Sequence, residues 1–203
     1  MTYKIDYSTF DLSKRTVIID ADTLLYSAAS AQEKMYYTLT NKHNGRDKKF
    51  QYVKEYKAWL EEYSLNIEDF EITSEKVVEG KLEFALGSVK QKISNILEAC
   101  GAEDCRICIG GKDNFRMSFE SQWVKYKAQR TSKPVFLEEC REFVKKKYGS
   151  KAMVADGIEA DDILTMVGWW YYNLPDSTTK NLKDRLILAC IDKDIKANVV
   201  GYF

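Results

Sequence analysis

The sequence has few of the residues on which several classes of site depend. It contains one histidine, two prolines and five cysteines in 203 residues. An odd number of cysteines does not suggest a disulfide framework, and a single histidine, His43, with only one Cys-x-x-Cys pair argues against a zinc site. That pair, Cys105 and Cys108, lies in an apolar segment with the pattern of a strand interior. We therefore expect buried, reduced thiols.

Long apolar runs and net charge are also lacking. No segment approaches the ~20 apolar residues that span a bilayer, and the N-terminus has no signal-peptide core. We therefore expect a cytoplasmic protein with no membrane partner. Basic and acidic residues both number 31, which gives a formal net charge of zero. Any nucleic-acid site must then be a local patch.

What is present predicts an α/β domain. Apolar residues make up 45% of the chain and charged residues 31%, which is typical of a globular protein with a sizeable core. Apolar runs that predict strands cover 15–19, 106–109, 153–155 and 186–191. Helical periodicity covers 23–29, 81–100, 135–148 and 159–171. Their alternation predicts βαβ units, with a central, mostly parallel sheet flanked by helices.

Residues 31–80 interrupt this alternation. They are rich in lysine, glutamate and tyrosine, and we interpret them as an insertion of unknown role within a single domain that spans 1–203. Within the insertion, residues 52–63 are compatible with a short helix that carries Tyr56, Trp59 and Tyr63 on one stripe. Such a stripe is more often packing than a platform for stacking bases.

Carboxylates follow the predicted strands. Asp20 and Asp22 follow the first strand, where an extended backbone would point both side chains the same way, with Asp22 or Thr23 as N-cap of the next helix. The alternative is that one of the two acids only caps that helix. The second and the last strand are followed by Asp113, Asp192 and Asp194.

The densest acidic group is Glu159, Asp161 and Asp162, at the start of a predicted helix. One acid at that place suits the helix dipole, but three repel one another unless a divalent cation relieves the repulsion. Because parallel strands place their carboxyl ends at one edge of a sheet, we expect all these acids to converge there. The oxygen-only donor set favours Mg²⁺ or Mn²⁺, and two such ions would support phosphoryl displacement.

One local patch has the composition of a nucleic-acid-binding segment. Its basic residues are Arg116, Lys125, Lys127, Arg130 and Lys133. Phe115, Trp123 and Tyr126 are interleaved with them. Basic side chains neutralise phosphates and aromatic rings stack on bases, so the segment suits nucleic acid. A solvated basic face is the alternative.

These motifs occur in the order seen in 5′-nucleases. They are Ile18-Ile19-Asp20-Ala21-Asp22, Asn114-Phe115-Arg116, Tyr126-Lys127-Ala128-Gln129-Arg130, Gly157-Ile158-Glu159-Ala160-Asp161-Asp162 and Asp192-Lys193-Asp194. The chain resembles the bacteriophage 5′→3′ exonucleases, which are relatives of flap endonucleases and of the nuclease domain of bacterial DNA polymerase I. The motifs extend over 16–198, nearly the whole chain.

The resemblance implies a PIN-like (resolvase-like) fold with a helical arch-like segment, and two-metal hydrolysis of DNA at 5′ ends, flaps or duplexes. By motif match, three residues of this chain resemble the ligands of the first metal: Asp20, Glu159 and Asp161. Three further residues resemble those that lie at or between the two metal sites: Asp162, Asp192 and Asp194. The basic element that contacts the scissile phosphate matches Tyr126, Lys127 and Arg130, with Lys127 as the stabiliser of the transition state.

Two departures from the family pattern matter. The family carries an acid in the loop after the second strand, and Asp113, the candidate here, falls a few residues late. Family members also continue into further carboxylates and a helix-hairpin-helix-like element that grips duplex DNA, whereas this sequence ends at Phe203. Either a further C-terminal segment or a partner chain supplies that part, or the protein has lost it.

Two alternatives stay open. A PIN-type ribonuclease uses similar acids but lacks the Tyr-Lys-x-x-Arg element. A catalytically incomplete module that binds DNA or a partner is the non-enzyme interpretation. Preference for strand polarity and sugar separates the two nucleases, and metal-dependent turnover separates both from the third.

Overall fold

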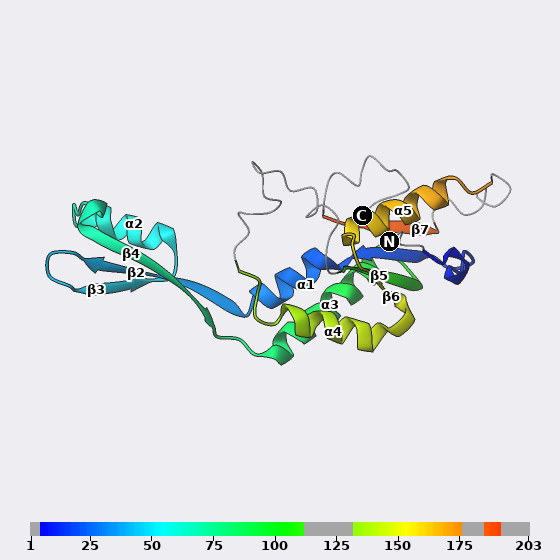
Figure 1. Cartoon of the computed structure of the whole chain (residues 1–203), viewed down its shortest axis with the longest axis horizontal. Coiled ribbons are helices and arrows are strands. Elements are labelled where there is room, and N and C mark those ends of the chain that lie inside the picture. Colours follow the sequence, from blue (N-terminus) through cyan, green and yellow to red (C-terminus); the bar gives the residue numbers. More distant parts are fainter. Residues whose placement is uncertain (1–4, 112–131, 176–184, 192–203) are drawn as a thin grey trace.

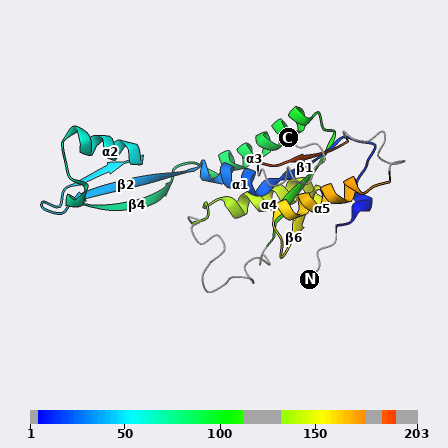
Figure 2. The ribbon, with the colours of Figure 1, turned by 90° about the horizontal axis from the view of Figure 1, so that it is seen from above.

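The computed structural model describes residues 5–111, 132–175 and 185–191. Within these ranges the chain forms a body and a projecting arm (Figure 1). The body contains a four-stranded sheet, and the arm, residues 33–78, contains a three-stranded sheet. A second view shows the arm extending away from the helices of the body (Figure 2).

The sheet of the body is parallel. Its strands are β1 (Thr16–Asp20), β5 (Asp104–Gly110), β6 (Ala152–Ala155) and β7 (Leu186–Ala189). They lie in the order β6-β5-β1-β7, and every pairing is parallel. All four predicted strands are present, and the prediction of an α/β fold with a central parallel sheet is confirmed.

Helices cover both faces of this sheet. On one face lie α1 (Ala21–Ser30), α3 (Leu82–Cys100) and α4 (Leu137–Tyr148), and on the other lies α5 (Ala160–Tyr172). Because successive strand residues point to opposite faces, Val17 and Ile19 enter the first core and Ile18 enters the second. Short 3-10 helices occur at η1 (Tyr7–Thr9), η2 (Ile67–Asp69) and η4 (Gly149–Lys151).

The same alternation explains the cysteine pair on β5. Cys105 and Cys108 are three residues apart in a strand, so they face opposite cores and are both buried. None of the five cysteines forms a disulfide; four are buried, and Cys190 is partly exposed. The prediction of buried, reduced thiols at Cys105 and Cys108 is confirmed.

The arm is a small layered unit. Its strands β2 (Glu33–Asn41), β3 (Asp47–Phe50) and β4 (Phe70–Val78) pair antiparallel in the order β3-β2-β4. Helix α2 (Val53–Glu62) packs on one face through Tyr56 and Leu60, against Leu39 and Phe70. The predicted helix is therefore present, and Tyr56 serves as packing.

Trp59 also packs in the arm, with its ring 5.5 Å from that of Phe50 and 5.6 Å from that of Phe70. Tyr63, the third residue of the predicted stripe, is 59% exposed. None of the helices in the ranges given above is long and apolar enough to cross a membrane.

Candidate functional site

The carboxyl ends of the four parallel strands form one edge of the sheet. The register pairs Ile19 of β1 with Ala189 of β7, and Gly110 of β5 with Ala155 of β6. The chain therefore leaves all four strands at the same edge, and α1 and α5 both begin there. Open parallel sheets bind their ligands at this kind of edge.

Asp20 ends β1 and caps α1. Its backbone is extended (φ −70°, ψ 105°), and its carboxylate accepts a hydrogen bond from the Asp22 N–H at 3.0 Å. The prediction that Asp22 or Thr23 would cap this helix is wrong, because the helix begins at Ala21. Asp22 thus lies in the first turn of the helix and does not continue the strand.

The two acids are held toward different neighbours of β1. On the β7 side, the Cys190 thiol donates to Asp20 Oδ2 at 3.4 Å. On the β5 side, both oxygens of the Asp22 carboxylate accept from the Gly110 N–H, at 3.3 and 3.2 Å. The prediction that both side chains point the same way from an extended backbone is therefore wrong.

Asp20 is in an environment that disfavours its charge. Burial, together with the nearby carboxylates of Asp22 and Asp161, raises the pKa of Asp20 to about 6, against hydrogen bonds from Cys190 and Asp22 that lower it. An ionised Asp20 at neutral pH therefore lacks full compensation within the part of the chain that the structure describes. A cation bound at this edge would supply that compensation.

Two glycines let Asp22 and β6 approach the end of β5. A Cβ atom on Gly110 would lie 2.4 Å from Asp22 Oδ2, and a Cβ atom on Gly111 would lie 2.1 Å from the carbonyl oxygen of Ala155. Both distances are shorter than non-bonded atoms tolerate. Glycine at position 111 is thus a condition for the close approach of the backbone after β6, and glycine at position 110 leaves room for the Asp22 carboxylate.

Arg141 and Cys190 belong to this edge but were not predicted from the sequence. Arg141 Nη2 lies 3.2 Å from Asp22 Oδ1, and Arg141 Nε is buried without a hydrogen-bond partner among the described atoms. The sequence does hold a signal for Arg141, since it is four residues after Leu137 and three before Val144, on the buried stripe of α4. Cys190 has no such signal, because only the pairing of β7 with β1 brings it to Asp20.

The acids of α5 have local structural roles. Glu159 is the N-cap, and its side chain accepts from the Asp162 N–H, while Asp162 Oδ2 accepts from the Glu159 N–H at 3.0 Å. This reciprocal pair is a capping box. Asp161 Oδ1 accepts from the Asp162 N–H at 2.8 Å, and Asp161 is the acid of this helix whose charge raises the pKa of Asp20.

The predicted metal ligands are thus brought together only in part. Asp20 and Asp161 influence one another at the edge, whereas Glu159 and Asp162 cap α5. Within the described ranges, no group of three or more histidine, cysteine, aspartate or glutamate side chains is arranged to hold a metal ion. The remaining predicted ligands lie outside those ranges, namely Asp113, Asp192 and Asp194.

Most of the predicted nucleic-acid interface also lies outside the described ranges. This applies to Arg116, Lys125, Tyr126, Lys127 and Arg130, and to the helical arch-like segment as a whole. Lys133, the last basic residue of the patch, is described and exposed.

The residues around Lys133 are fixed to the base of the arm. Lys76 Nζ donates to the Ser132 carbonyl oxygen at 2.9 Å, and the Val135 N–H donates to Glu33 Oε1 at 2.6 Å. Glu33 Oε2 also lies 3.2 Å from Lys76 Nζ, and the Glu33 side chain is only 5% exposed. The insertion therefore anchors the chain where the basic patch ends.

Comparison of the chain with protein-family models, curated proteins and solved structures gave no match. The residues and their geometry are therefore the basis for the function proposed next.

Proposed function

We propose that the chain is a metal-dependent 5′→3′ exonuclease or flap endonuclease that hydrolyses DNA and has a PIN-like fold. One observation carries the proposal: the parallel sheet brings Asp20 and the acidic start of α5 to the same edge, where the chain also leaves β5 and β7. Each of those two strands leads into a segment with further acids, Asp113 after β5 and Asp192 and Asp194 after β7.

The donor set at this edge suits a hard divalent cation. Asp20 and Asp161 offer carboxylate oxygens, and the raised pKa of Asp20 reflects negative charge that the described residues do not balance. Mg²⁺ or Mn²⁺ prefers such oxygen ligands. Asp20 and Asp161, together with Asp113, Asp192 and Asp194, would hold one or two ions. When bound, such ions activate water and stabilise the charge of a phosphoryl displacement.

The basic patch supports DNA as the substrate. It has alternating basic and aromatic residues in a chain with no net charge, and it follows β5, which ends at the same edge as β1. We assign phosphate contacts to Arg116, Lys125, Lys127, Arg130 and Lys133. Tyr126, Lys127 and Arg130 would contact the scissile phosphate, where Lys127 stabilises the developing charge.

The capping box of α5 favours a second candidate function. Because Glu159 and Asp162 satisfy backbone N–H groups, they are less available as ligands than their sequence pattern suggests. A chain with too few free carboxylates would bind DNA or a partner without cutting it. A nuclease assay separates the two functions.

The test is a nuclease assay on 5′-flap and duplex DNA labelled at either end, with Mg²⁺, Mn²⁺ or EDTA. The decisive variant is Asp161→Asn with Asp162→Asn, and the matched control is Glu83→Gln, which removes an exposed acid from the first turn of α3. We expect short products from the 5′ end with metal only, a loss of at least 10²-fold in the double variant, and normal activity in the control.

Other outcomes would contradict the proposal. Cleavage of RNA in preference to DNA would indicate a PIN-type ribonuclease. Binding of the labelled DNA without metal-dependent cleavage, by a chain that circular dichroism shows to be folded, would indicate the non-catalytic module.

A further inference from the structure

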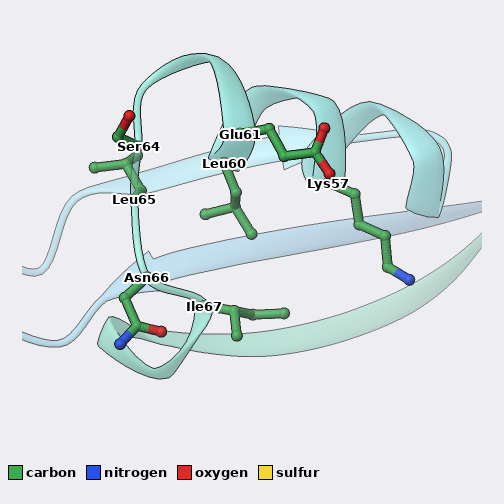
Figure 3. Close-up of a pocket in the computed structure, with 7 residues that line it drawn as sticks. All are labelled: Lys57, Leu60, Glu61, Ser64, Leu65, Asn66 and Ile67. Carbon is green, nitrogen blue, oxygen red and sulfur yellow. The ribbon is translucent and has the colours of Figure 1, made fainter.

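The two ends of the arm differ in how their charges are arranged. The outer end has a shallow groove of about 380 Å³ beside α2 (Figure 3). Charges of both signs lie at that end, where His43 Nε2 is 3.3 Å from Asp69 Oδ1 and Lys48 Nζ lies 4.4 Å from the centre of the Trp59 ring. The outer end therefore gives no charge preference for a partner. The end that joins the body, which we call the root (residues 32–34 and 76–80), has a more definite arrangement.

The root is closed where the chain enters and leaves the arm. The Gln32 carbonyl oxygen accepts hydrogen bonds from the N–H groups of both Glu79 and Gly80, each at 3.0 Å. Lys34 Nζ also lies 2.7 Å from Glu79 Oε2. These contacts join the first residues of the arm to the last, so the root is a fixed support.

A buried ion pair of the root holds the chain that precedes α4. Glu33 Oε2 lies 3.2 Å from Lys76 Nζ, and the two side chains are 5% and 22% exposed. Glu33 Oε1 accepts from the Val135 N–H at 2.6 Å, and Lys76 Nζ donates to the Ser132 carbonyl oxygen at 2.9 Å. Replacing a buried ion pair by apolar residues often costs no stability. The segment that this pair positions is therefore a better reason for its presence than stability is.

Lys133 is the residue that this anchor presents to solvent. It lies between the two anchored residues and is exposed, whereas Pro134 is buried. Proline fixes its own backbone and restricts the residue before it, so Lys133 has little backbone freedom. The acids that follow, Glu138 and Glu139, lie in the first turn of α4, and Glu138 pairs with Arg141. The two ion pairs of the root are each neutral, so Lys133 adds a positive charge beside it.

The anchored stretch leads through α4 to the candidate site. The Leu137 N–H donates to the Pro134 carbonyl oxygen at 3.2 Å, so the helix begins directly after the anchor. One turn further along, Arg141 contacts Asp22 at the carboxyl edge of the sheet. The chain from Lys133 to Arg141 spans at most about 20 Å. That length corresponds to roughly six nucleotides of one DNA strand, so a single strand can reach both places.

We propose that Glu33 and Lys76 are positioning residues, which hold Lys133 against a phosphate of the DNA strand that enters the candidate site. The inference rests on the proposed function and gives the insertion a role in it, because the root of the arm supports part of the DNA-binding surface. Glu33 and Lys76 act through the backbone of residues 132–135. Without them Lys133 keeps its charge but is no longer held in place, and its contact with the phosphate weakens.

The test measures the affinity of the whole chain for a labelled 5′-flap DNA in EDTA, by fluorescence anisotropy at several salt concentrations. The anchor variant, Glu33→Leu with Lys76→Met, replaces the ion pair by apolar side chains of similar size. We expect its affinity to fall about threefold or more, and the slope of log affinity against log salt to shrink by about one phosphate contact. Lys133→Met should give the same two changes. Combining it with the anchor variant should add no further loss.

Lys49→Met with Glu75→Leu is the matched control, because it removes the same two residue types from an ion pair of the arm outside the root. It should leave affinity and salt slope unchanged. Lys76→Met alone breaks the Ser132 contact and keeps the Val135 contact, so it should give a smaller loss than the anchor variant. It replaces the anchor variant if circular dichroism shows that variant to be unfolded.

Four results would overturn the inference. They are wild-type affinity in the anchor variant, an equal loss in the control, losses of the anchor variant and Lys133→Met that add, and a wild type that does not bind DNA. The last result would overturn the proposed function as well. DNA that the wild type binds but does not cut with Mg²⁺ would overturn the nuclease function alone, so the two failures are distinguishable.

Discussion

Two carboxylates at opposite ends of the parallel sheet differ in how their charge is balanced. Asp104 begins β5 and lies 2.7 Å from Arg106 Nη1, with Lys151 as a second partner. Burial opposes its ionisation, but the hydrogen bonds from Lys151 and Arg106 outweigh burial and lower the pKa of Asp104. Asp20 ends the neighbouring strand β1, and there burial and two nearby acids raise the pKa to about 6.

The difference separates the end of the sheet where buried charge is balanced from the end that holds the candidate site. At the amino end, each acid has a basic partner, and Arg106 also ties η1 to the sheet through the Thr9 carbonyl oxygen. At the carboxyl end, the hydrogen-bond donors that Asp20 has among the described residues are a thiol and a backbone N–H, beside two other acids. Uncompensated buried charge of this kind is typical of sites that bind a cation or react. Four substitutions test this comparison.

The largest effect is expected at the balanced end. Arg106→Met removes a guanidinium that is about 10% exposed and binds Asp104 and two carbonyl oxygens. We expect the free energy of unfolding in urea to fall by about 3 kcal/mol, because Asp104 stays buried with Lys151 alone. Arg185→Met, which removes a half-exposed arginine 4.0 Å from Glu103, is the control and should cost about 0.5 kcal/mol or less. Equal losses in the two variants would contradict the claim that Arg106 balances the buried charge of Asp104.

Asp20→Asn should change the free energy of unfolding in the opposite direction and stabilise the protein. The folded-state pKa of Asp20 lies above the unfolded value, so folding favours its protonated form. The contribution of Asp20 to stability is therefore greatest below about pH 4 and falls as the pH rises through 6. Asparagine keeps the N-cap but carries no charge. We therefore expect the variant to be more stable than the wild type by about 2 kcal/mol at pH 8 in EDTA, and equal to it near pH 4.

Urea unfolding across that pH range measures the effect. A difference that does not change with pH would mean that the substitution acts on the helix cap and not on the charge. Destabilisation at pH 8 would show that Asp20 is already balanced, and the comparison between the two ends would fail.

Arg141→Met tests the basic group that contacts Asp22 at the carboxyl end. Without it, Asp22 retains the Gly110 N–H but loses its ion pair, and we expect a loss of about 1 kcal/mol. Adding Asp22→Asn to the same chain should recover most of that loss, and the double-mutant cycle isolates the pair. If the two losses simply add, Arg141 acts through packing alone.

Lys151→Met should have the smallest effect. Its ammonium group contacts Asp104, but the side chain is 47% exposed, so we expect about 0.5 kcal/mol at pH 7. Because the pKa of Asp104 is lowered, its stabilising contribution is present above pH 4 and is lost as the pH falls through the folded-state value. Acid titration of the variant should therefore show a shallower loss of stability below pH 4 than the wild type shows.

The body of the fold and the helix of the arm could be predicted from sequence, and the strands of the arm could not. The strands of the body are short apolar runs buried on both faces, which leave a clear signal. In the arm, β3 reads Asp-Lys-Lys-Phe and most of β4 is exposed, so polar residues conceal the alternation. An antiparallel sheet packed on one face normally leaves a clear alternation, but the arm core buries only Leu39 and Phe70 among its strand residues, so the alternation is nearly absent.

At the candidate site, residue types were predictable and their geometry was not. Asp20 and Asp22 are both good capping residues, so the sequence alone does not place the helix start to within one residue. The spacing of Glu159 and Asp162 fits both a ligand pair and a capping box. Contacts such as Cys190 with Asp20 depend on strand pairing between distant segments.

The order of strands also determines when the protein can fold. The central strand β1 pairs only with β5 and β7, which are made about ninety and one hundred and seventy residues later. The arm, in contrast, contains all of its strand partners within residues 33–78. Local strand pairing is fast and distant pairing is slow, so the arm should form during synthesis, before β1 is paired with its neighbours. Until β5 emerges from the ribosome, the β-branched segment Thr16–Ile19 is an unpaired edge and a target for chaperones.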